Sequence, residues 1–300
     1  MTDTALFESE IPNLDLIARG KVRDIYAVDK ERLLIVTTDR LSAYDVVMPD
    51  PVPGKGELLC RLSAFWFSMM ADIVPNHLTG LPLTSCIDDH SLAESLEGRS
   101  IIVKRLNPLP IEAVVRGYLI GSGWRDYQAS GTICGLSLPN GLVQGQRLPE
   151  LLYTPATKAD VGGHDENISF EQTVELIGAP LADRVRELTI AIYERAVAHA
   201  LERGIIIADT KFEFGLDDEK NLYVIDEMLT PDSSRFWPLD EYRTGTSPPS
   251  YDKQFVRDYL DTLDWNHEPP GPGLPADVIA KTREKYAEAL QRLTGPASRE

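Results

Sequence analysis

The chain is short of positive charge. Its 300 residues include 30 Lys and Arg against 47 Asp and Glu, which gives a formal net charge of −17 at pH 7. A surface of this sign repels phosphate backbones, so we expect no nucleic-acid partner. The shortage also gives weight to local groups of cations, because an acidic protein that binds anions must gather its few Lys and Arg in one place.

Cysteine and long apolar runs are scarce as well. Cys60, Cys86 and Cys134 stand far apart, so they form neither a C-x-x-C site nor a disulfide framework, and we expect buried or half-buried thiols in a reducing compartment. The five histidines are equally scattered, which argues against a zinc cluster. No uninterrupted apolar run approaches the roughly 20 residues that cross a bilayer. The acidic amino terminus lacks the pattern of a secretory signal, so we expect a cytoplasmic protein without a membrane partner.

Several catalytic motifs are missing. Gly54-Lys55 lacks the upstream glycine of a Walker A sequence, and there is no G-x-G-x-x-G, no G-x-S-x-G and no H-R-D catalytic loop. These absences count against hydride transfer, serine hydrolysis and ordinary protein phosphorylation.

The pattern of apolar residues predicts strands early in the chain and helices late. We expect a hairpin arm at 19–29, strands at 32–39, 100–106 and 111–120, helices at 57–74 and 180–203, and two helices in the tail. The prolines of "LNPLP", at 106–110, indicate a linker. We therefore expect the α+β class, with a β-rich lobe over residues 1–106 and a larger α/β lobe over residues 107–300.

Residues 139–169 are rich in Gly, Pro and Asn, and we expect them to be irregular. Irregular segments of this length inside compact domains are often functional. Lys158, Asp165 and Glu166 are candidate ligand contacts there, and a surface loop without any ligand is the equal alternative.

The sharpest polar pattern lies in a predicted hairpin, "IIIADTKFEFG" followed by "LYVID". Alternation places Asp209, Lys211 and Glu213 on one face of the first strand, and the turn after it brings Asp226 beside them. Two carboxylates on neighbouring strands are ligands that Mg²⁺ uses when it also holds nucleotide phosphates. A lysine between them can reach a phosphate. The alternative is a solvated face with cross-strand ion pairs, which the apolar run directly upstream disfavours.

Cations also gather in "ARGKVRDIY", where Arg19, Lys21 and Arg23 surround Gly20. A glycine turn between strands lets backbone N–H groups and a lysine approach phosphates. A solvated hairpin tip is at least as good an interpretation of this segment alone.

Other polar groups stand at strand ends, where binding groups are common. Arg40, Ser42 and Asp45 crowd the end of the strand predicted at 32–39. The remaining candidate anion contacts are Arg116, Ser122 and Arg235. The planar fork of an arginine suits a phosphate or a carboxylate.

Five blocks of the sequence, in order, resemble signature blocks of the SAICAR synthetase family. They are "GKVRDIY", "TTDRLSAYDVVMP", "VVRGYLIGSGW", "ADTKFEFG" and "VIDEMLTPDSSRFWP". The resemblance runs from about Ile17 to the end, and the tail blocks "YDKQFVRDYL" and "LPADVIAKTREKYAEALQRLTG" resemble the longer, single-function form of the family. Several ordered blocks in register are far more specific than any single motif.

The resemblance implies a two-lobed, SAICAR-synthase-like fold related to ATP-grasp enzymes and protein kinases, with ATP between the lobes. It also implies a reaction of de novo purine (IMP) biosynthesis. ATP, carboxyaminoimidazole ribotide and L-aspartate give the succinocarboxamide, ADP and phosphate. Because a carboxylate is a poor electrophile, we expect its conversion to an acyl phosphate that the aspartate amine attacks. Charge neutralisation dominates such phosphoryl transfers, so cations and Mg²⁺ are expected in the site.

The resemblance assigns roles to most of these residues. Glu213 and Asp226 are implied to hold Mg²⁺, Lys21 to reach the nucleotide phosphates, and the linker to lie against adenine. The implied ATP-binding residues are Gly20, Lys21, Val22, Arg23, Lys104, Arg105 and Leu106, together with Glu213 and Asp226. The implied ribotide-binding residues are Arg116, Ser122, Asp209, Lys211, Asp232, Ser234 and Arg235. The residues expected to take part in catalysis are Asp209, Lys211, Glu213 and Asp226.

The site for L-aspartate is a hypothesis from charge. A dicarboxylate needs a cation and its amine needs an acceptor, so we expect Arg40, Ser42 and Asp45 to form this site. An amine must be neutral to attack, so a nearby carboxylate is expected to take its proton.

Two other functions stay open at this point. A small-molecule kinase would use the same Mg-ATP half-site with a hydroxyl acceptor, and a non-catalytic module would bind Mg-ATP without turnover. The expected partners are the three small-molecule substrates, and a monomer is favoured because the extended tail can replace a partner subunit.

Overall fold

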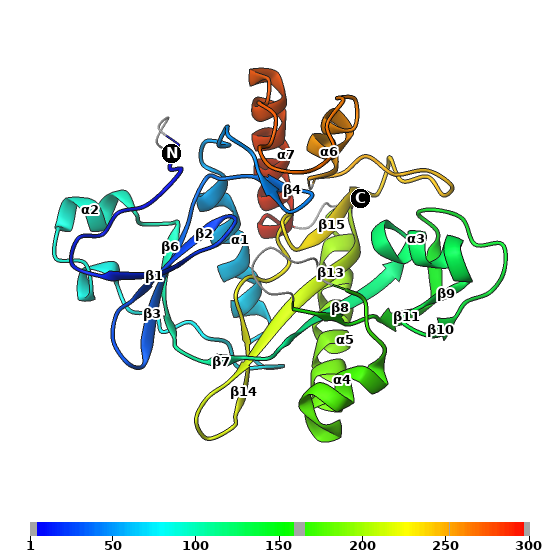
Figure 1. Ribbon diagram of the computed structural model, residues 1–300, viewed down its shortest axis with the longest axis horizontal. Helices are drawn as coiled ribbons and strands as arrows, with labels where there is room; N and C mark the ends of the chain where they lie inside the picture. Colours follow the sequence, from blue (N-terminus) through cyan, green and yellow to red (C-terminus); the bar gives the residue numbers. More distant parts are fainter. Residues whose placement is uncertain (1–4, 159–165, 252, 297–300) are drawn as a thin grey trace.

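Two antiparallel sheets organise the described part of the chain, residues 5–158, 166–251 and 253–296 of a computed structural model (Figure 1). The first sheet contains β1 (Asp15–Arg19), β2 (Arg23–Ala27), β3 (Arg32–Thr37) and β6 (Ser100–Lys104), in that spatial order. The second contains β7 (Asn107–Pro108), β8 (Ile111–Tyr118), β11 (Arg147–Tyr153), β12 (Ala156–Thr157), β13 (Ile205–Leu216), β14 (Leu222–Ile225) and β15 (Ser234–Pro238). Two short ladders pair β4 (Ser42–Ala43) with β5 (Val46–Val47), and β9 (Thr132–Ile133) with β10 (Leu136–Ser137).

Strand β13 is the centre of the second sheet. It is 12 residues long and pairs with β8, β15, β14 and β7. Its first half, "IIIADT", is buried on both faces because strands and helices cover it. After that, half-buried Lys211 and Glu213 alternate with buried Phe212 and Phe214. The predicted alternation is therefore confirmed, and one face of β13 is polar where the sheet meets the first lobe.

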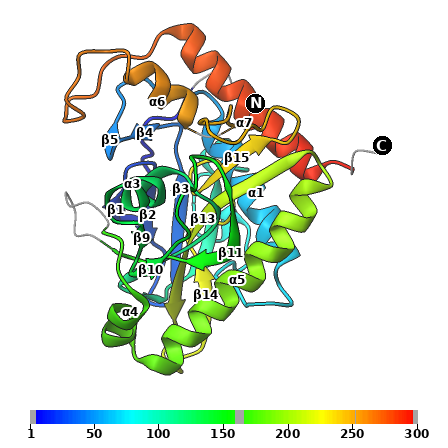
Figure 2. The same cartoon turned by 90° about the vertical axis from the view of Figure 1, so that its right-hand side faces the viewer.

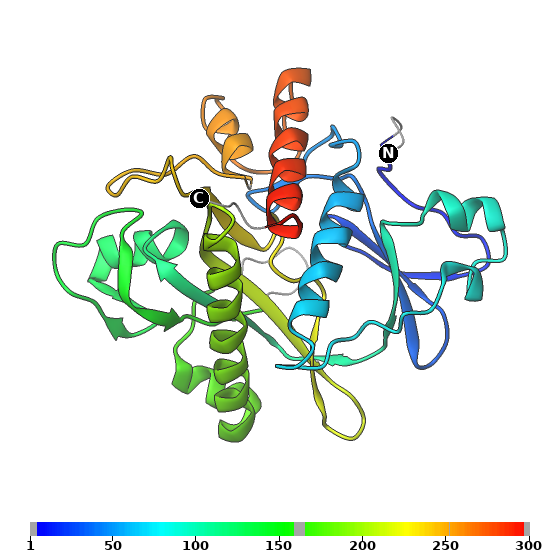
Figure 3. The same cartoon turned by 180° about the vertical axis from the view of Figure 1, so that it is seen from behind.

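Helices cover the back of the second sheet, and Figure 3 shows three of them side by side there. The described residues as a whole form the helices α1 (Lys55–Met69), α2 (His90–Ser95), α3 (Gly121–Ser130), α4 (Phe170–Ile177), α5 (Ala179–Leu201), α6 (Gln254–Leu260) and α7 (Ala276–Thr294), with a short 3₁₀ turn at Leu83–Ser85. The three on the back are α1, α5 and α7. Helices α6 and α7 lie at one end of the molecule and α4 lies at the other (Figures 1 and 2).

Hydrophobic packing crosses the linker at 106–110. In α1, Leu58 and Trp66 belong to the same core as Val185 of α5, Phe212 of β13 and Tyr286 of α7. A smaller core lies between the first sheet and α2. The chain passes from the first sheet to the second at the linker. Helix α1 precedes the linker in the sequence, but it packs against elements that follow the linker.

The segment between β3 and α1 also packs on the tail. Leu41, Met48 and Val52 form a cluster with Val256 of α6 and with Leu274. The loop that follows the first three strands is thereby held by the last two helices, which positions it over the polar face of β13.

The mixed α+β class, the strands predicted in the first third and the long helices are confirmed. The prediction of an irregular segment at 139–169 is wrong for its middle, where β11 and β12 pair with β8. The physical reason is the shift in register between Arg147 and Leu152, which spans Pro149. A proline has no N–H for the ladder, so the strand looks broken in the sequence.

Candidate active site

A cleft of about 630 Å³ separates the first sheet from the polar face of β13. The turn between β1 and β2 and the loop at 42–45 line one side of it, and strands β8 and β13 line the other. The predicted residues that line it are Gly20, Lys21, Val22, Arg23, Ser42, Asp45, Lys158, Lys211, Glu213, Asp226 and Asp232. The structure therefore brings together about half of the site residues that were predicted from separate parts of the sequence, whereas Arg116, Ser122, Asp209, Ser234 and Arg235 do not line this cleft.

Glu213 and Asp226 face this cleft from neighbouring strands. Glu213 lies on β13 opposite Ile225, the last residue of β14, and Asp226 follows directly. The Glu213 carboxylate accepts hydrogen bonds from Lys158 at 2.5 Å and from Lys211 at 3.2 Å. Asp226 accepts one from Arg23 at 2.8 Å. Both carboxylates are thus neutralised by cations that the chain itself supplies.

The two carboxylates differ in their pKa values. Burial raises the pKa of Asp226 to about 6, because the attraction of Arg23 does not fully offset the loss of water and the repulsion of Glu213. Burial acts in the same direction on Glu213, but Lys211 and Lys158 outweigh it and lower its pKa to about 2. Lys211 itself has a raised pKa despite burial, since Glu213 and Glu112 both attract it. At neutral pH Lys211, Glu213 and Asp226 are therefore all charged.

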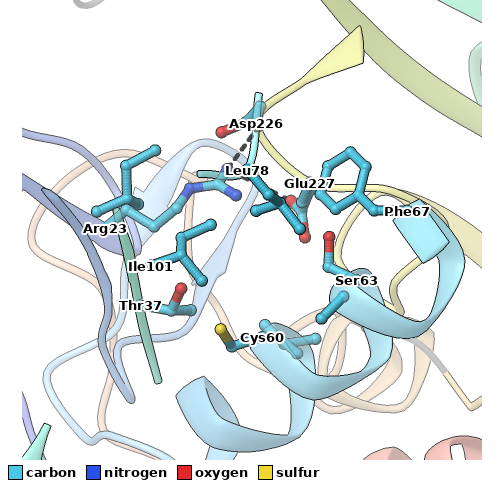
Figure 4. A pocket seen from close by; sticks show the side chains of 12 residues that line it. Arg23, Thr37, Cys60, Ser63, Phe67, Leu78, Ile101, Asp226 and Glu227 are labelled. Atoms are coloured by element: carbon cyan, nitrogen blue, oxygen red, sulfur yellow. Dashed lines mark hydrogen bonds and ion pairs between the residues drawn. The ribbon is translucent and has the colours of Figure 1, made fainter. Parts of the chain in front are cut away.

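An apolar pocket lies behind the Arg23–Asp226 ion pair, between α1 and the first sheet (Figure 4). Its walls include Cys60 and Phe67 of α1 and Ile101 of β6. Burial raises the pKa of the Cys60 thiol to about 11, so it is neutral and unreactive. All three cysteines are free, Cys60 buried and the others half-buried, which confirms the prediction from their spacing.

Asp209 lies between two arginines. In β13 it is opposite Arg116 of β8 on one side and Arg235 of β15 on the other. The same carboxylate oxygen, Oδ2, accepts from Arg116 at 3.0 Å and from Arg235 at 2.6 Å. Arg116 also donates to Thr154 Oγ1 and to Ser122 Oγ, each at 2.9 Å. Because two guanidinium groups share one carboxylate, a net positive charge remains at the Asp209 end of the polar face of β13.

Gly121 makes room for Arg235. Its φ is +61°, and a Cβ there would lie 2.4 Å from Arg235 Nη2. Glycine is thus required twice at the start of α3, for the backbone conformation and for the approach of the guanidinium. Ser234 Oγ lies beside Arg235 on β15, within 2.8 Å of Thr210 Oγ1.

Arg40 is placed differently from the hypothesis. It is 3% exposed and does not line the cleft. Its guanidinium donates to Asp24 at 2.8 Å, to the Gly20 carbonyl at 3.0 Å and to the Lys21 carbonyl at 3.2 Å. Arg40 therefore holds the β1–β2 turn from inside, and its donors are already used there.

Ser42 and Asp45 do reach the cleft. Asp45 forms an ion pair with Lys21 across its mouth, and Ser42 Oγ accepts from Lys253 Nζ at 3.4 Å. The linker residues Lys104, Arg105 and Leu106 lie outside the residues that line the cleft, and Lys104 stacks on Tyr223 at 4.4 Å. Asp165 lies outside the described residues.

The residues that sequence reasoning missed are Glu112, Glu227, Lys253 and Arg257, all of which line the cleft. Glu112 is four residues from Arg116 on one strand, so alternation could have placed it on the same face. Glu227 follows Asp226 directly. No pattern in the sequence shows that Lys253 and Arg257 reach the cleft, because this depends on how the tail packs.

Comparison with known proteins matches most of the chain to one family. A family model described as SAICAR synthetase matches residues 16–272. The chain belongs to the SAICAR synthetase family. The phosphoribosylaminoimidazole-succinocarboxamide synthase of Methylococcus capsulatus is 62% identical over 290 residues, which cover 97% of this chain and 98% of the relative. That of Thioalkalivibrio sulfidiphilus is 63% identical over 290 residues, with the same coverage.

The fold agrees with a solved member of the SAICAR synthetase family. The SAICAR synthase of Saccharomyces cerevisiae, solved in complex with SAICAR, has a TM-score of 0.89 and 44% identity, covering 99% of this chain and 100% of that one. The chain is an ATP-dependent ligase of de novo purine biosynthesis, which joins L-aspartate to the carboxylate of carboxyaminoimidazole ribotide. The kinase and non-catalytic alternatives are set aside by this match.

Arg40→Met should lower the free energy of unfolding by about 3–5 kcal/mol, because it leaves the Asp24 carboxylate buried without its main partner. Urea unfolding measures this, and Arg61→Met, which removes an exposed arginine of α1, should stay within about 0.5 kcal/mol of the natural protein. Near-normal stability together with a raised KM for L-aspartate would return Arg40 to the substrate site.

Proposed function

We propose that the cleft aligns the three reactants along the polar face of β13. Asp209, Lys211 and Glu213 stand two residues apart, so the row from the first to the last is about 13 Å long at ~3.3 Å per residue. The Asp209 end carries surplus positive charge and suits the ribotide phosphate. The Glu213 end, with Asp226, suits the nucleotide phosphates. This alignment is the observation that carries the proposal.

The carboxylates fit a magnesium ion that arrives with ATP. The described residues contain no group of three or more His, Cys, Asp or Glu side chains arranged to hold a metal. Mg²⁺ is commonly held by one or two carboxylates while substrate phosphates and waters complete its shell. Glu213 and Asp226 are such a pair, and the bound ion would neutralise the charge of the transferring phosphoryl group.

The chain's own cations orient the substrates. Lys21, next to the glycine turn, reaches toward the nucleotide phosphates. Arg235, with Ser122 and Ser234, holds the ribotide phosphate, while Arg116 fixes Asp209 and Ser122. Lys211, held by Glu112 at 2.6 Å, faces the imidazole carboxylate and stabilises the charge that develops when it becomes an acyl phosphate.

The second half-reaction needs a neutral amine. The aspartate amine attacks the acyl carbon, phosphate leaves, and the proton of the amine passes to a carboxylate of the cleft. Asp45 faces the cleft and is the acceptor in this proposal. It forms an ion pair with Lys21 at the mouth of the cleft.

The remaining assignments concern the whole protein. The linker at Lys104–Leu106 binds adenine, and residues 1–106 and 107–300 form the two lobes. The protein acts as a monomer in the cytoplasm. No helix in the described ranges is long and apolar enough to cross a membrane.

The proposal is tested by an assay in which ATP, the ribotide or L-aspartate is omitted in turn. ADP release and succinocarboxamide formation should both require all three reactants. ADP release with an alcohol acceptor in place of the ribotide carboxylate and aspartate would overturn the ligase assignment. Thermal stabilisation by Mg-ATP without turnover in the complete mixture would overturn it as well.

Glu213→Gln and Asp226→Asn should each abolish turnover with little loss of stability. Their affinities for Mg-ADP, measured calorimetrically from pH 5 to pH 7.5, should differ in pH dependence. Since Asp226 has a pKa of about 6, it is protonated below that pH. The ratio of the Mg-ADP affinity of the natural protein to that of Asp226→Asn should therefore fall about tenfold per pH unit below pH 6. The comparison with the variant cancels the titration of the nucleotide.

The ratio of the Mg-ADP affinity of the natural protein to that of Glu213→Gln should stay constant from pH 5 to pH 7.5, because the pKa of Glu213 is lowered to about 2. A pH-independent advantage of the natural protein over Asp226→Asn would contradict the assignment of Asp226.

Gly121→Ala should displace Arg235 from Asp209 and weaken ribotide binding about 10- to 100-fold, as Arg235→Ala should also do. The matched control is Gly131→Ala, at the other end of α3. Gly131 has a φ of +72° but no heavy atom within 4 Å of its Cβ position, so it carries the backbone strain alone. Equal ribotide affinities of the two variants, measured by calorimetry, would count against the role of Arg235.

A further inference from the structure

The turn between β4 and β5 holds two residues in an unusual backbone conformation. The register of the two short strands leaves a loop of Tyr44 and Asp45 alone. Their φ values are +53° and +63°, and positive values at both positions are those of a type I′ hairpin turn. Such turns favour Asn and Gly, because a bulky side chain is strained in the left-handed region. A tyrosine at the first position therefore needs support from outside the turn.

The tail of the chain supplies this support. The Tyr44 hydroxyl donates to Asp261 Oδ1 at 2.6 Å, and the Tyr44 ring stacks on His267 with 3.9 Å between the ring centroids and 6° between the ring planes. His267 Nε2 lies 3.5 Å from the same oxygen of Asp261. Trp265 packs edge-on against both rings, with centroids 6.3 Å from Tyr44 and 5.1 Å from His267. One segment of the tail thus fixes both the ring plane and the hydroxyl of Tyr44.

Two further contacts attach the tail to the chain after the turn. Asp50 Oδ2 accepts from the backbone N–H of Leu274 at 2.8 Å. A Cβ at Gly271 would lie 2.8 Å from Met48 Cε, so the tail backbone passes directly over this side chain. Strand β4 lies next to α6 in two perpendicular views (Figures 1 and 2). The tail therefore follows the segment from Tyr44 to Asp50, and the anchor of the turn is the first of several contacts.

Asp45 is the residue of the turn that carries charge into the cleft. It lines the cleft and forms an ion pair with Lys21 at the mouth. The anchoring residues Asp261 and His267 are not among the described residues that line the cleft. Because Asp45 follows Tyr44 directly, the conformation of the turn sets where its carboxylate stands. Tyr44 is thus the connection between the tail and this wall of the cleft.

We propose that Tyr44 is a positioning residue, which Asp261 and His267 anchor so that the strained turn holds the Asp45 carboxylate at the cleft. The inference rests on the proposed function, in which Asp45 accepts the proton of the aspartate amine. A displacement of about 1 Å can cost a reacting group about 100-fold in rate. Loss of the anchor should therefore slow turnover and leave the binding of the ribotide unchanged.

The kinetic test compares Tyr44→Phe and Asp261→Ala, which remove the two partners of one hydrogen bond. The matched controls are Tyr259→Phe and Asp258→Ala. Tyr259 packs on the same cluster, and its hydroxyl makes no hydrogen bond within the described residues, while Asp258 is an exposed carboxylate of α6. We expect kcat to fall about tenfold in both anchor variants, with the KM for the ribotide changed less than about threefold. The controls should behave as the natural protein, and normal turnover of Asp261→Ala would overturn the inference.

Hydrogen exchange measures the anchor without any turnover. The amides of residues 42–47 should exchange about tenfold faster in Tyr44→Phe and Asp261→Ala, while those of β13 keep their natural rates. Tyr44→Gly separates strain from anchoring, because glycine adopts a positive φ without strain but has no ring to anchor. We expect Tyr44→Gly to lose at least as much turnover as Tyr44→Phe. Normal turnover of Tyr44→Gly would show that the turn places Asp45 by itself, and would overturn the inference.

Asp45→Asn tests whether the anchor acts through Asp45. If it does, adding Asp261→Ala to Asp45→Asn should lower kcat less than about twofold further. Losses that multiply in full, or unchanged exchange of residues 42–47, would overturn the inference. Normal turnover of Asp45→Asn would instead overturn the proton-acceptor role in the proposed function, and the exchange of residues 42–47 would still decide whether Tyr44 holds the turn.

Discussion

The pairing of β13 with strands on both sides is the constraint from which the site follows. Its register places Arg116 and Arg235 opposite Asp209, so two guanidinium groups converge on one carboxylate. The same register turns Phe212 into the core and Lys211 toward the cleft. A slip of one residue would exchange the two faces and bury the polar row. The packing of the core and the arrangement of the polar side chains therefore require the same register of β13. A change of that register would also disrupt the core.

The local sequence pattern was enough to predict that Asp209, Lys211 and Glu213 share one face of a strand. It was not enough to predict which other side chains surround them. Alternation with period two is a property of one strand, so it placed Asp209 and Glu213 on one face without any knowledge of the fold. The hairpin that brings Asp226 beside them is equally local. Arg40 could not be judged in this way, because the groups that occupy its guanidinium lie some twenty positions earlier in the chain. The proline of β11 hid a strand for a different reason, since it removes a ladder hydrogen bond within the strand itself.

Cations within the cleft do more than attract substrates. Arg23 and Lys158 hold Asp226 and Glu213 as ion pairs, so the carboxylates tolerate one another in a protein that is acidic as a whole. Asp232 plays the converse part for Lys55 and Lys253. Each reactive group is thus stabilised by an opposite charge from another element. These ion pairs preorganise the charged groups of the cleft and offset the cost of their desolvation.

The loop at 41–52 forms a wall of the cleft, yet it is attached to the tail. The Tyr44 ring stacks on His267 at 3.9 Å, and its hydroxyl donates to Asp261 at 2.6 Å. Together with the shared core of α1, this attachment ties parts of the first lobe to the second at two places. A rigid swing of one lobe against the other would have to break both. The tip of the β1–β2 turn lies outside both attachments, and its carbonyl groups are held by Arg40.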